Sequence, residues 1–244
     1  MNAEIYTSLV EKAKAGQKML AVLIDPDKCS DAHLQILLPL LRKYTPDFIF
    51  IGGSQLKISF SALIQTFKNE LHIPVVLFPG DVSQFSPDAD ALLLLSLISG
   101  RNPEYLISQH VNAAISISNS GLEVIPTGYM LVDGGTKSAV EYISNTQPIP
   151  RDKNDIALAT ALAGQLLGMK AIYLEAGSGA KLPVPTDMIR HLKSHLSVPL
   201  IVGGGIKTET QLQAAFQAGA DLVVIGNILE TEPEMIARFV NHLI

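Results

Sequence analysis

The sequence predicts an α/β protein of the (β/α)₈ class, the TIM barrel. Short apolar runs recur along the chain with amphipathic, helix-like stretches between them, and several runs end in glycine. Eight such β-then-α units in 244 residues match the size of one barrel. We therefore expect a single domain over residues 1–244.

The expected strands are apolar runs bounded by glycine, proline or polar residues, as is typical of buried parallel strands. In order they are Met19–Ile24, Phe48–Ile51, Pro74–Phe78, Ala91–Leu95, Glu123–Leu131, Ala171–Leu174, Pro199–Val202 and Leu222–Ile225. The helical spacing of apolar residues predicts a helix after every strand except the third. These helices are Ala32–Lys43, Leu56–Leu71, Glu104–Ser116, Asn154–Leu167, Asp187–His195, Glu209–Gln217 and Pro233–Leu243.

Two connections depart from this alternation. Pro79–Asp90 is short and polar and contains two prolines, so we expect a loop in place of the helix after the third strand. The barrel would then be open on that flank. Asp133–Asp152 is a second long loop, with Gly134-Gly135 near its start.

The composition argues against several classes of protein. A net charge of −5 without a basic cluster speaks against a nucleic-acid partner. The longest strongly apolar run, Ala91–Ile98, is too short to cross a bilayer, so membrane contact would be peripheral at most. A lone cysteine, Cys29, leaves no internal disulfide and fits a reducing cytoplasm. The six histidines show no paired spacing, so zinc is not expected.

A glycine-rich segment stands at the end of each of the last three expected strands, and together these segments predict a phosphate site. They are Tyr173–Gly179, Val202–Gly205 and Ile225–Asn227. Glycine lets the backbone approach a ligand, and the helix that begins next offers free N–H groups and a positive dipole end. The alternative is that these glycines only make tight turns, although single glycines would suffice for that.

The end of the first strand carries two carboxylates, Asp25 and Asp27, on either side of a proline. Carboxylate, water and ligand phosphate oxygens together suit Mg²⁺. Ser54 follows two glycines at the end of the second strand, faces the same mouth, and would complete that site. The alternative is a plain turn, with Asp31 capping the next helix.

Glu175 is a lone carboxylate inside the first glycine segment. Desolvation beside a bound phosphate should raise its pKa and let it act as a general base. Alternatively, it only accepts hydrogen bonds from loop N–H groups. Tyr129, at the end of the fifth strand, either bonds a ligand or forms part of the wall.

The segments at the strand ends, taken together and in their order along the chain, resemble those of geranylgeranylglyceryl phosphate synthase. The resemblance is carried by Asp25–Lys28, Ile51–Ser54, Pro126–Tyr129, Tyr173–Gly179, Val202–Ile206 and Ile225–Asn227. Bacterial heptaprenylglyceryl phosphate synthases are relatives, but they carry the shorter Tyr-Leu-Glu-Tyr-Ser-Gly where this chain has Tyr173–Gly179. That segment and Ser99–Pro103 favour the geranylgeranyl branch.

The resemblance implies a prenyltransferase of ether-lipid biosynthesis. It would join the geranylgeranyl group of geranylgeranyl diphosphate to the hydroxyl of sn-glycerol 1-phosphate and release diphosphate. It implies Mg²⁺ at Asp25 and Ser54, a homo-oligomer (dimer or hexamer), and Glu175 and Tyr173 as catalytic residues. The implied glycerol-phosphate site is Tyr173, Leu174, Glu175, Ala176, Gly177, Ser178, Gly179, Gly204, Gly205, Gly226 and Asn227.

The diphosphate and its tail need further groups. We expect Lys28 or Arg101 to assist the diphosphate. An apolar trough for the tail is expected along Phe78–Phe85 and Leu92–Ile98, because each buried methylene contributes about 0.8 kcal/mol.

Two other functions remain open. Another phosphate-binding barrel enzyme, such as a sugar-phosphate isomerase or epimerase or thiamine phosphate synthase, would share the glycine loops. Asp25 with Ser54, and a single carboxylate at Glu175 in place of an acid/base pair, favour metal-assisted displacement of diphosphate. A non-catalytic scaffold would bind glycerol 1-phosphate without forming product.

Overall fold

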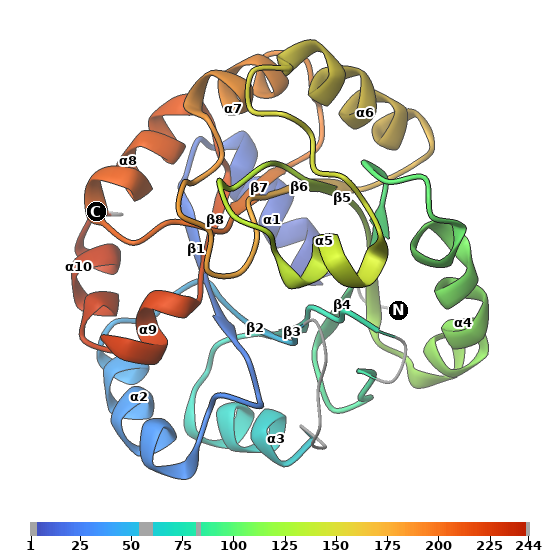
Figure 1. The fold of residues 1–244 in the computed structure, drawn as a ribbon. Helices are drawn as coiled ribbons and strands as arrows, with labels where there is room; N and C mark the ends of the chain where they lie inside the picture. The colour runs from blue at the N-terminus through green and yellow to red at the C-terminus, as the bar shows by residue number, and fades with distance from the viewer. Residues whose placement is uncertain (1–3, 54–60, 82–83, 243–244) are drawn as a thin grey trace.

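Eight parallel strands form one closed barrel in the computed structural model, which describes residues 4–53, 61–81 and 84–242 (Figure 1). Each strand pairs with its neighbours in sequence, and the first pairs with the last. The strands are β1 (Met19–Ile24), β2 (Phe48–Ile51), β3 (Val75–Leu77), β4 (Ala91–Leu97), β5 (Glu123–Leu131), β6 (Ala171–Glu175), β7 (Leu200–Gly203) and β8 (Leu222–Ile225). The predicted (β/α)₈ class is confirmed.

A ring of helices surrounds the strands (Figure 1). It consists of α2 (Asp31–Lys43), α3 (Ser61–Glu70), α4 (Gln109–Ser120), α6 (Asn154–Leu166), α7 (Thr186–Lys193), α8 (Glu209–Ala218) and α10 (Met235–Asn241). A π-helical turn, η1 (Glu104–Ser108), leads into α4. In the part of the chain that the structure describes, no helix has the length and apolar character needed to span a membrane.

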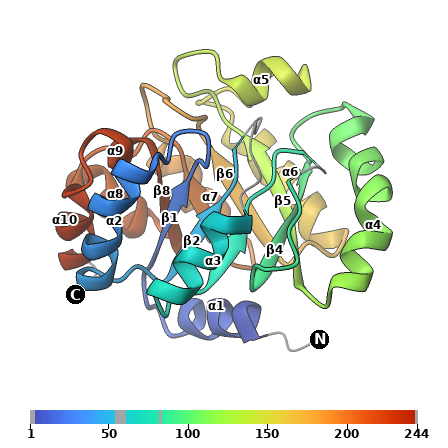
Figure 2. The ribbon, with the colours of Figure 1, turned by 90° about the horizontal axis from the view of Figure 1, so that it is seen from below.

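Three helices were not predicted from the sequence. They are α1 (Glu4–Lys14), α5 (Ala139–Ser144) and α9 (Asn227–Thr231). Figure 2 shows α1 beneath the barrel and α5 above the opposite end. The expectation of an unbroken loop over Asp133–Asp152 is therefore wrong, because Ser138 caps α5 by accepting a hydrogen bond from Glu141 N (3.1 Å). Asp31 is likewise not a cap: α2 begins after Ser30, whose hydroxyl accepts from His33 N.

The flank after β3 lacks a helix, as expected. The described residues 79–81 and 84–90 contain none. The sheet itself stays closed there, since β3 pairs with β4 through Val76↔Ala91 and Leu77↔Leu92. The opening is thus confined to the helix layer, beside the upper half of β4.

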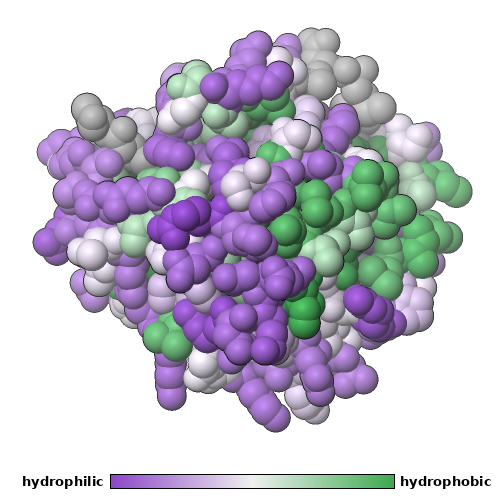
Figure 3. Space-filling model, turned by 90° about the horizontal axis from the view of Figure 1, so that it is seen from above, coloured by the Kyte–Doolittle hydropathy of each residue, from purple (hydrophilic) through white to green (hydrophobic). Residues whose placement is uncertain are grey.

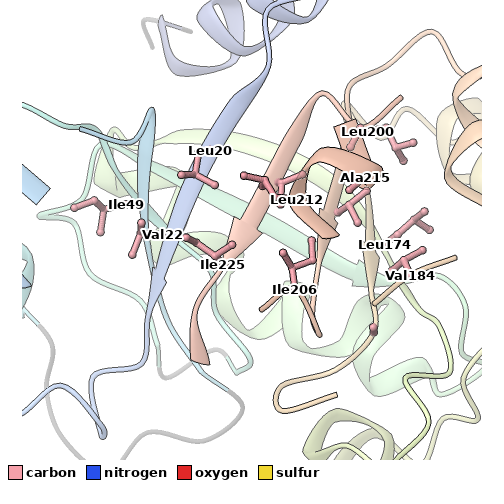
Figure 4. Close-up of a cluster of buried hydrophobic side chains, with 14 of the residues drawn as sticks. Leu20, Val22, Ile49, Leu174, Val184, Leu200, Ile206, Leu212, Ala215 and Ile225 are labelled. Carbon is pink, nitrogen blue, oxygen red and sulfur yellow. The ribbon is translucent and has the colours of Figure 1, made fainter. Parts of the chain in front are cut away.

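The hydrophobic core has two layers, because successive strand residues point to opposite faces of the sheet. On β6, Tyr173 belongs to the inner cluster that fills the barrel, and Leu174 belongs to the outer cluster beneath the helices. Figure 4 shows part of the outer layer, where Leu200 and Ile225 of the strands lie near Leu212 of α8. The carboxyl ends of the strands, above this packed interior, remain available for a site.

Candidate active site

A cavity of about 450 Å³ opens at the carboxyl ends of the strands and extends to the flank that lacks a helix. Its lining divides by chemistry. The polar part includes Asp25, Lys28, Glu175, Ser178 and Lys207, and the apolar part includes Phe85, Leu92, Leu94, Ala113 and Ile117. Residues of α5, which lies over the mouth in Figure 2, also contribute to the lining. The cavity therefore joins a charged mouth to an apolar trough.

Glu175 is the buried carboxylate of this cavity. It ends β6, its residue is 6% exposed, and it forms no ion pair with any cationic side chain in the described ranges. Burial raises the pKa of this carboxyl to about 7, although the Gly177 N–H and the Tyr173 hydroxyl both act to lower it. Oε1 accepts the Gly177 N–H at 2.7 Å, so Glu175 also makes the backbone bond of the alternative interpretation.

Tyr173 lies directly beneath this carboxylate in an aromatic cluster. Its ring centroid is 5.2 Å from that of Phe78 and 5.4 Å from that of Tyr129. Burial raises the pKa of both tyrosines, with the nearby Glu175 adding to the effect, so both hydroxyls are neutral. The buried Tyr173 hydroxyl faces the Glu175 carboxylate but is not in strict hydrogen-bond geometry with it, so a bound ligand can complete its hydrogen bonding.

The three glycine segments meet at the mouth, as predicted. Asn227 Oδ1 accepts hydrogen bonds from Ser178 Oγ (3.1 Å) and Gly179 N (3.2 Å), so it links the loop after β6 to the start of α9. Gly204 and Gly205 have φ values of 81° and 72°, in the left-handed region that only glycine enters easily. All these residues line the cavity, where backbone N–H groups can face a phosphate.

Asp25 lies at the end of β1, beside the glycine loop that follows β8, because these two strands are paired. Its Oδ1 accepts the Asp27 N–H at 3.1 Å, and its backbone oxygen accepts Lys28 N at 3.0 Å, so the turn interpretation is also correct. Lys28 Nζ lies 3.5 Å from Asp25 Oδ2 and 3.1 Å from Glu230 Oε1. Asp25 and Lys28 thus bring one anionic and one cationic group to the same wall.

Asp25 fits a Mg²⁺ site only if water and substrate phosphate supply most of the ligands of the ion. No cluster of three or more His, Cys, Asp or Glu side chains within residues 4–53, 61–81 and 84–242 can hold a metal. Mg²⁺ commonly uses one or two carboxylates and takes its other ligands from water and substrate phosphate, which Asp25 alone satisfies. The other predicted ligand, Ser54, lies outside the described residues.

The two predicted diphosphate cations differ in position. Lys28 lines the cavity, whereas Arg101 is absent from the lining and donates from Nη1 to its neighbour's carbonyl, Gly100 O, at 2.7 Å. Lys207, which no prediction included, lines the cavity beyond the β7 glycines. Lys207 lies two residues after the glycine triplet 203–205, and this position in the sequence could have marked it as a residue of the site.

Gln84 is a second residue that the sequence did not reveal. It is 2% exposed, donates to Gly53 O (2.8 Å) and accepts from Gly80 N (3.0 Å). It therefore ties the loop after β2 to the loop that replaces a helix. No local pattern marks this role, since the bond to Gly53 spans 31 residues.

Glycine loops, a buried carboxyl and an apolar trough at the carboxyl end of a barrel define a phosphate-binding TIM-barrel enzyme. The chain belongs to the PcrB family, whose model matches residues 14–243. It is 50% identical over 237 residues to the geranylgeranylglyceryl phosphate synthase of Chitinophaga pinensis (97% of this chain, 94% of that protein). The corresponding enzyme of Thermococcus kodakarensis is 40% identical over 229 residues (93% and 90%).

Solved structures agree. The chain resembles (S)-3-O-geranylgeranylglyceryl phosphate synthase from Thermoplasma acidophilum in complex with its substrate sn-glycerol-1-phosphate, with a TM-score of 0.91, 34% identity, and coverage of 98% of this chain and 97% of that one. A tryptophan synthase α-subunit from Pyrococcus furiosus, with a TM-score of 0.57 and 14% identity, shares the fold alone. The predicted family, whose members are prenyltransferases, is confirmed.

Proposed function

We propose that the protein is a Mg²⁺-dependent prenyltransferase that joins the geranylgeranyl group of geranylgeranyl diphosphate to the hydroxyl of sn-glycerol 1-phosphate. The observation that carries this function is Glu175, a buried carboxyl with a pKa raised to about 7 where the glycine loops meet the trough. A group that titrates near neutral pH is suited to accept a proton from a hydroxyl.

The two phosphate-bearing substrates occupy adjoining parts of the mouth, which meet where β8 pairs with β1. Glycerol phosphate binds at the glycine loops, through the residues from Tyr173 to Gly179 together with Gly204, Gly205, Gly226 and Asn227. The relative from Thermoplasma acidophilum binds this same ligand, which supports the assignment. The diphosphate binds near Asp25 and Lys28. Asp25 would hold Mg²⁺, which would supply charge neutralisation for the leaving diphosphate.

The transfer itself needs one proton acceptor. The glycerol hydroxyl gives its proton to Glu175, where Oε2 is the oxygen not engaged by Gly177. Its oxygen then forms the ether bond to C1 of the prenyl chain, while the bond from C1 to the diphosphate oxygen breaks with its electron pair. The rings of Tyr129, Tyr173 and Phe78 exclude water here and present π faces to positive charge developing on C1.

The prenyl tail occupies the trough. No helix follows β3 in the described residues, so the outward-facing Leu92 and Leu94 of β4 remain open to the cavity. Ala113 and Ile117 of α4 line the cavity with them. Phe85 forms the rim. This surface is apolar and suits a chain that the charged mouth would reject.

Turnover of the substrate pair tests the function. Purified protein with radiolabelled glycerol 1-phosphate, geranylgeranyl diphosphate and Mg²⁺ should give an organic-extractable product, which EDTA abolishes. Prenyl diphosphates of other lengths should react more slowly. Asp25→Asn should raise the Mg²⁺ and diphosphate concentrations required, whereas Asp27→Asn, outside the lining, should not. Metal-independent turnover of a sugar phosphate, or binding without product, would point to the other functions.

We also propose that the enzyme is a cytoplasmic homo-oligomer. Ile107, Val111 and Ile115 lie four residues apart on η1 and α4 and are 57%, 64% and 77% exposed. Leu166 and Leu167 at the end of α6 are similarly exposed, and Figure 3 shows hydrophobic side chains gathered on the side where α6 and α4 lie. A patch of this kind favours a protein partner, here a second copy. Ile115→Lys should lower the mass measured by analytical ultracentrifugation, and an unchanged mass would contradict this interface.

A further inference from the structure

We propose that Gly203 is a positioning residue for the base: because it lacks a side chain, the Tyr173 hydroxyl and the Glu175 carboxylate can meet beside the end of β7. The inference rests on the proposed function in one respect, the role of Glu175 as base. The sequence placed Gly203 in a segment predicted to form a phosphate site, and a role in positioning the base differs from the close approach to a ligand that glycine loops usually provide.

The space beside Gly203 is fully occupied by the two catalytic side chains. A Cβ atom built there would lie 2.2 Å from the Tyr173 hydroxyl oxygen, 3.0 Å from Glu175 Oε2 and 3.0 Å from Tyr173 Cζ. At Gly204 a Cβ would lie 2.3 Å from Glu175 Oε1. Each carboxylate oxygen is therefore backed by a different glycine.

Strand pairing fixes this contact. Glu175 and Gly203 are register partners across β6 and β7, and Ala176 N donates to Gly203 O at 3.1 Å. Gly203 does not occupy the left-handed region, unlike Gly204 with its φ of 81°. An alanine at position 203 is thus acceptable to the backbone, and only the neighbouring side chains exclude it.

The Tyr173 side chain cannot readily move away from a methyl group at position 203. Its side chain is fully buried, and its ring is packed against Phe78 and Tyr129. A methyl group at position 203 must therefore displace the Glu175 carboxylate, the tyrosine oxygen, or both. A displacement of about 1 Å in a reacting group lowers turnover by about 100-fold.

The test is a cycle of Gly203→Ala, Tyr173→Phe and the double variant. Gly203→Ala should lower kcat about 100-fold, shift the acidic limb of the pH–rate profile, and leave the KM for prenyl diphosphate nearly unchanged. In the double variant the clashing oxygen is gone, so kcat and the pH profile should match those of Tyr173→Phe alone. Gly164→Ala is the matched control, since its Cβ would meet side-chain carbons alone: Cδ1 of Ile98 (2.7 Å), Cδ1 of Ile172 (3.2 Å) and Cγ of Met169 (3.6 Å).

Wild-type kcat and pH profile in Gly203→Ala, or losses that simply add in the double variant, would overturn the inference. If Gly203→Ala does not fold, the double variant decides: it should fold and behave as Tyr173→Phe, and a double variant that also fails to fold counts against us. Carbon-13 NMR titration of Glu175 without substrates separates this inference from the proposed function. A titration that Gly203→Ala shifts and Tyr173→Phe restores would uphold it even if the wild type makes no product.

Discussion

The two ends of the barrel both contain buried carboxylates and treat them in opposite ways. At the amino-terminal end, Asp221 is 3% exposed, lies 2.6 Å from Lys193 Nζ and accepts the Leu200 N–H at 2.8 Å. At the carboxyl end, Glu175 is similarly buried but has one backbone donor and no cationic partner in the described part of the chain. Polar groups are thus satisfied where the chain needs stability and left incomplete where a ligand would bind.

The amino-terminal end of the barrel has the same arrangement of a paired, hydrogen-bonded aspartate at three strands. Asp47, Asp90 and Asp221 each stand just before an even-numbered strand, accept an N–H from the preceding strand and pair with a lysine. Those lysines are Lys12, Lys68 and Lys193. Each carboxylate therefore joins two strands and one cation from a helix, so the charge of each carboxylate is balanced at this end of the barrel.

The largest expected effect is on turnover at the mouth. Glu175→Gln keeps an acceptor for the Gly177 N–H but removes the base, so kcat should fall about 1,000-fold. The affinity for glycerol 1-phosphate, measured by calorimetry, should change little because the glycine loops are intact. A variant with wild-type kcat would show that the unsatisfied carboxylate has no catalytic role.

The next effect concerns stability and its dependence on pH. Burial raises the pKa of Glu175 in the folded protein to about 7, from 4.5 for an ordinary glutamate, so the folded protein binds the proton more tightly than the unfolded chain. The stability of the wild type must then fall as pH rises from about 4.5 to about 7. Glu175→Gln removes this loss, so its gain in unfolding free energy should be near zero below pH 4.5 and about 3 kcal/mol above pH 7.

Denaturant unfolding at a series of pH values measures that difference. Parallel stability curves for the wild type and Glu175→Gln would mean that the carboxyl titrates equally in both states. A gain that grows toward acid pH would reverse the sign and contradict the burial argument. Either result would remove the contrast between the two ends of the barrel.

The sequence predicted what depends on local pattern. The eight strands, the glycine segments and the position of Glu175 followed from apolar runs and the turns after them, and the structure has all three, with strand ends within two residues of those predicted. The role of Gln84 did not follow, because its bond to Gly53 spans 31 residues. The helix α1 escaped for a related reason: its amino end is held by Glu123, whose carboxylate accepts the Ile5 and Tyr6 N–H groups.

The same limit applies to Gly203. A glycine triplet indicates close approach of something, and a phosphate was the natural candidate. Which atom approaches depends on the register between β6 and β7, which sets Gly203 opposite Glu175. Register of parallel strands joined through a helix has no short-range signal, so only the folded sheet distinguishes a glycine that faces a ligand from one that faces the base.

The smallest effect is expected at the amino-terminal end and should leave catalysis unchanged. Asp221→Asn keeps an acceptor for Leu200 N but loses the charge paired with Lys193, which is 34% exposed. Partial solvent exposure of the lysine reduces the loss, so the unfolding free energy should fall by about 2 kcal/mol. Lys193→Met should destabilise similarly, and the two together by less than their sum, because each removes the same pair. Since Asp221 lies at the opposite end of the barrel from Glu175, kcat below the melting temperature should equal that of the wild type. A loss of kcat without a loss of stability would mean that the two ends are coupled, and the division between a stabilising end and a reactive end would fail.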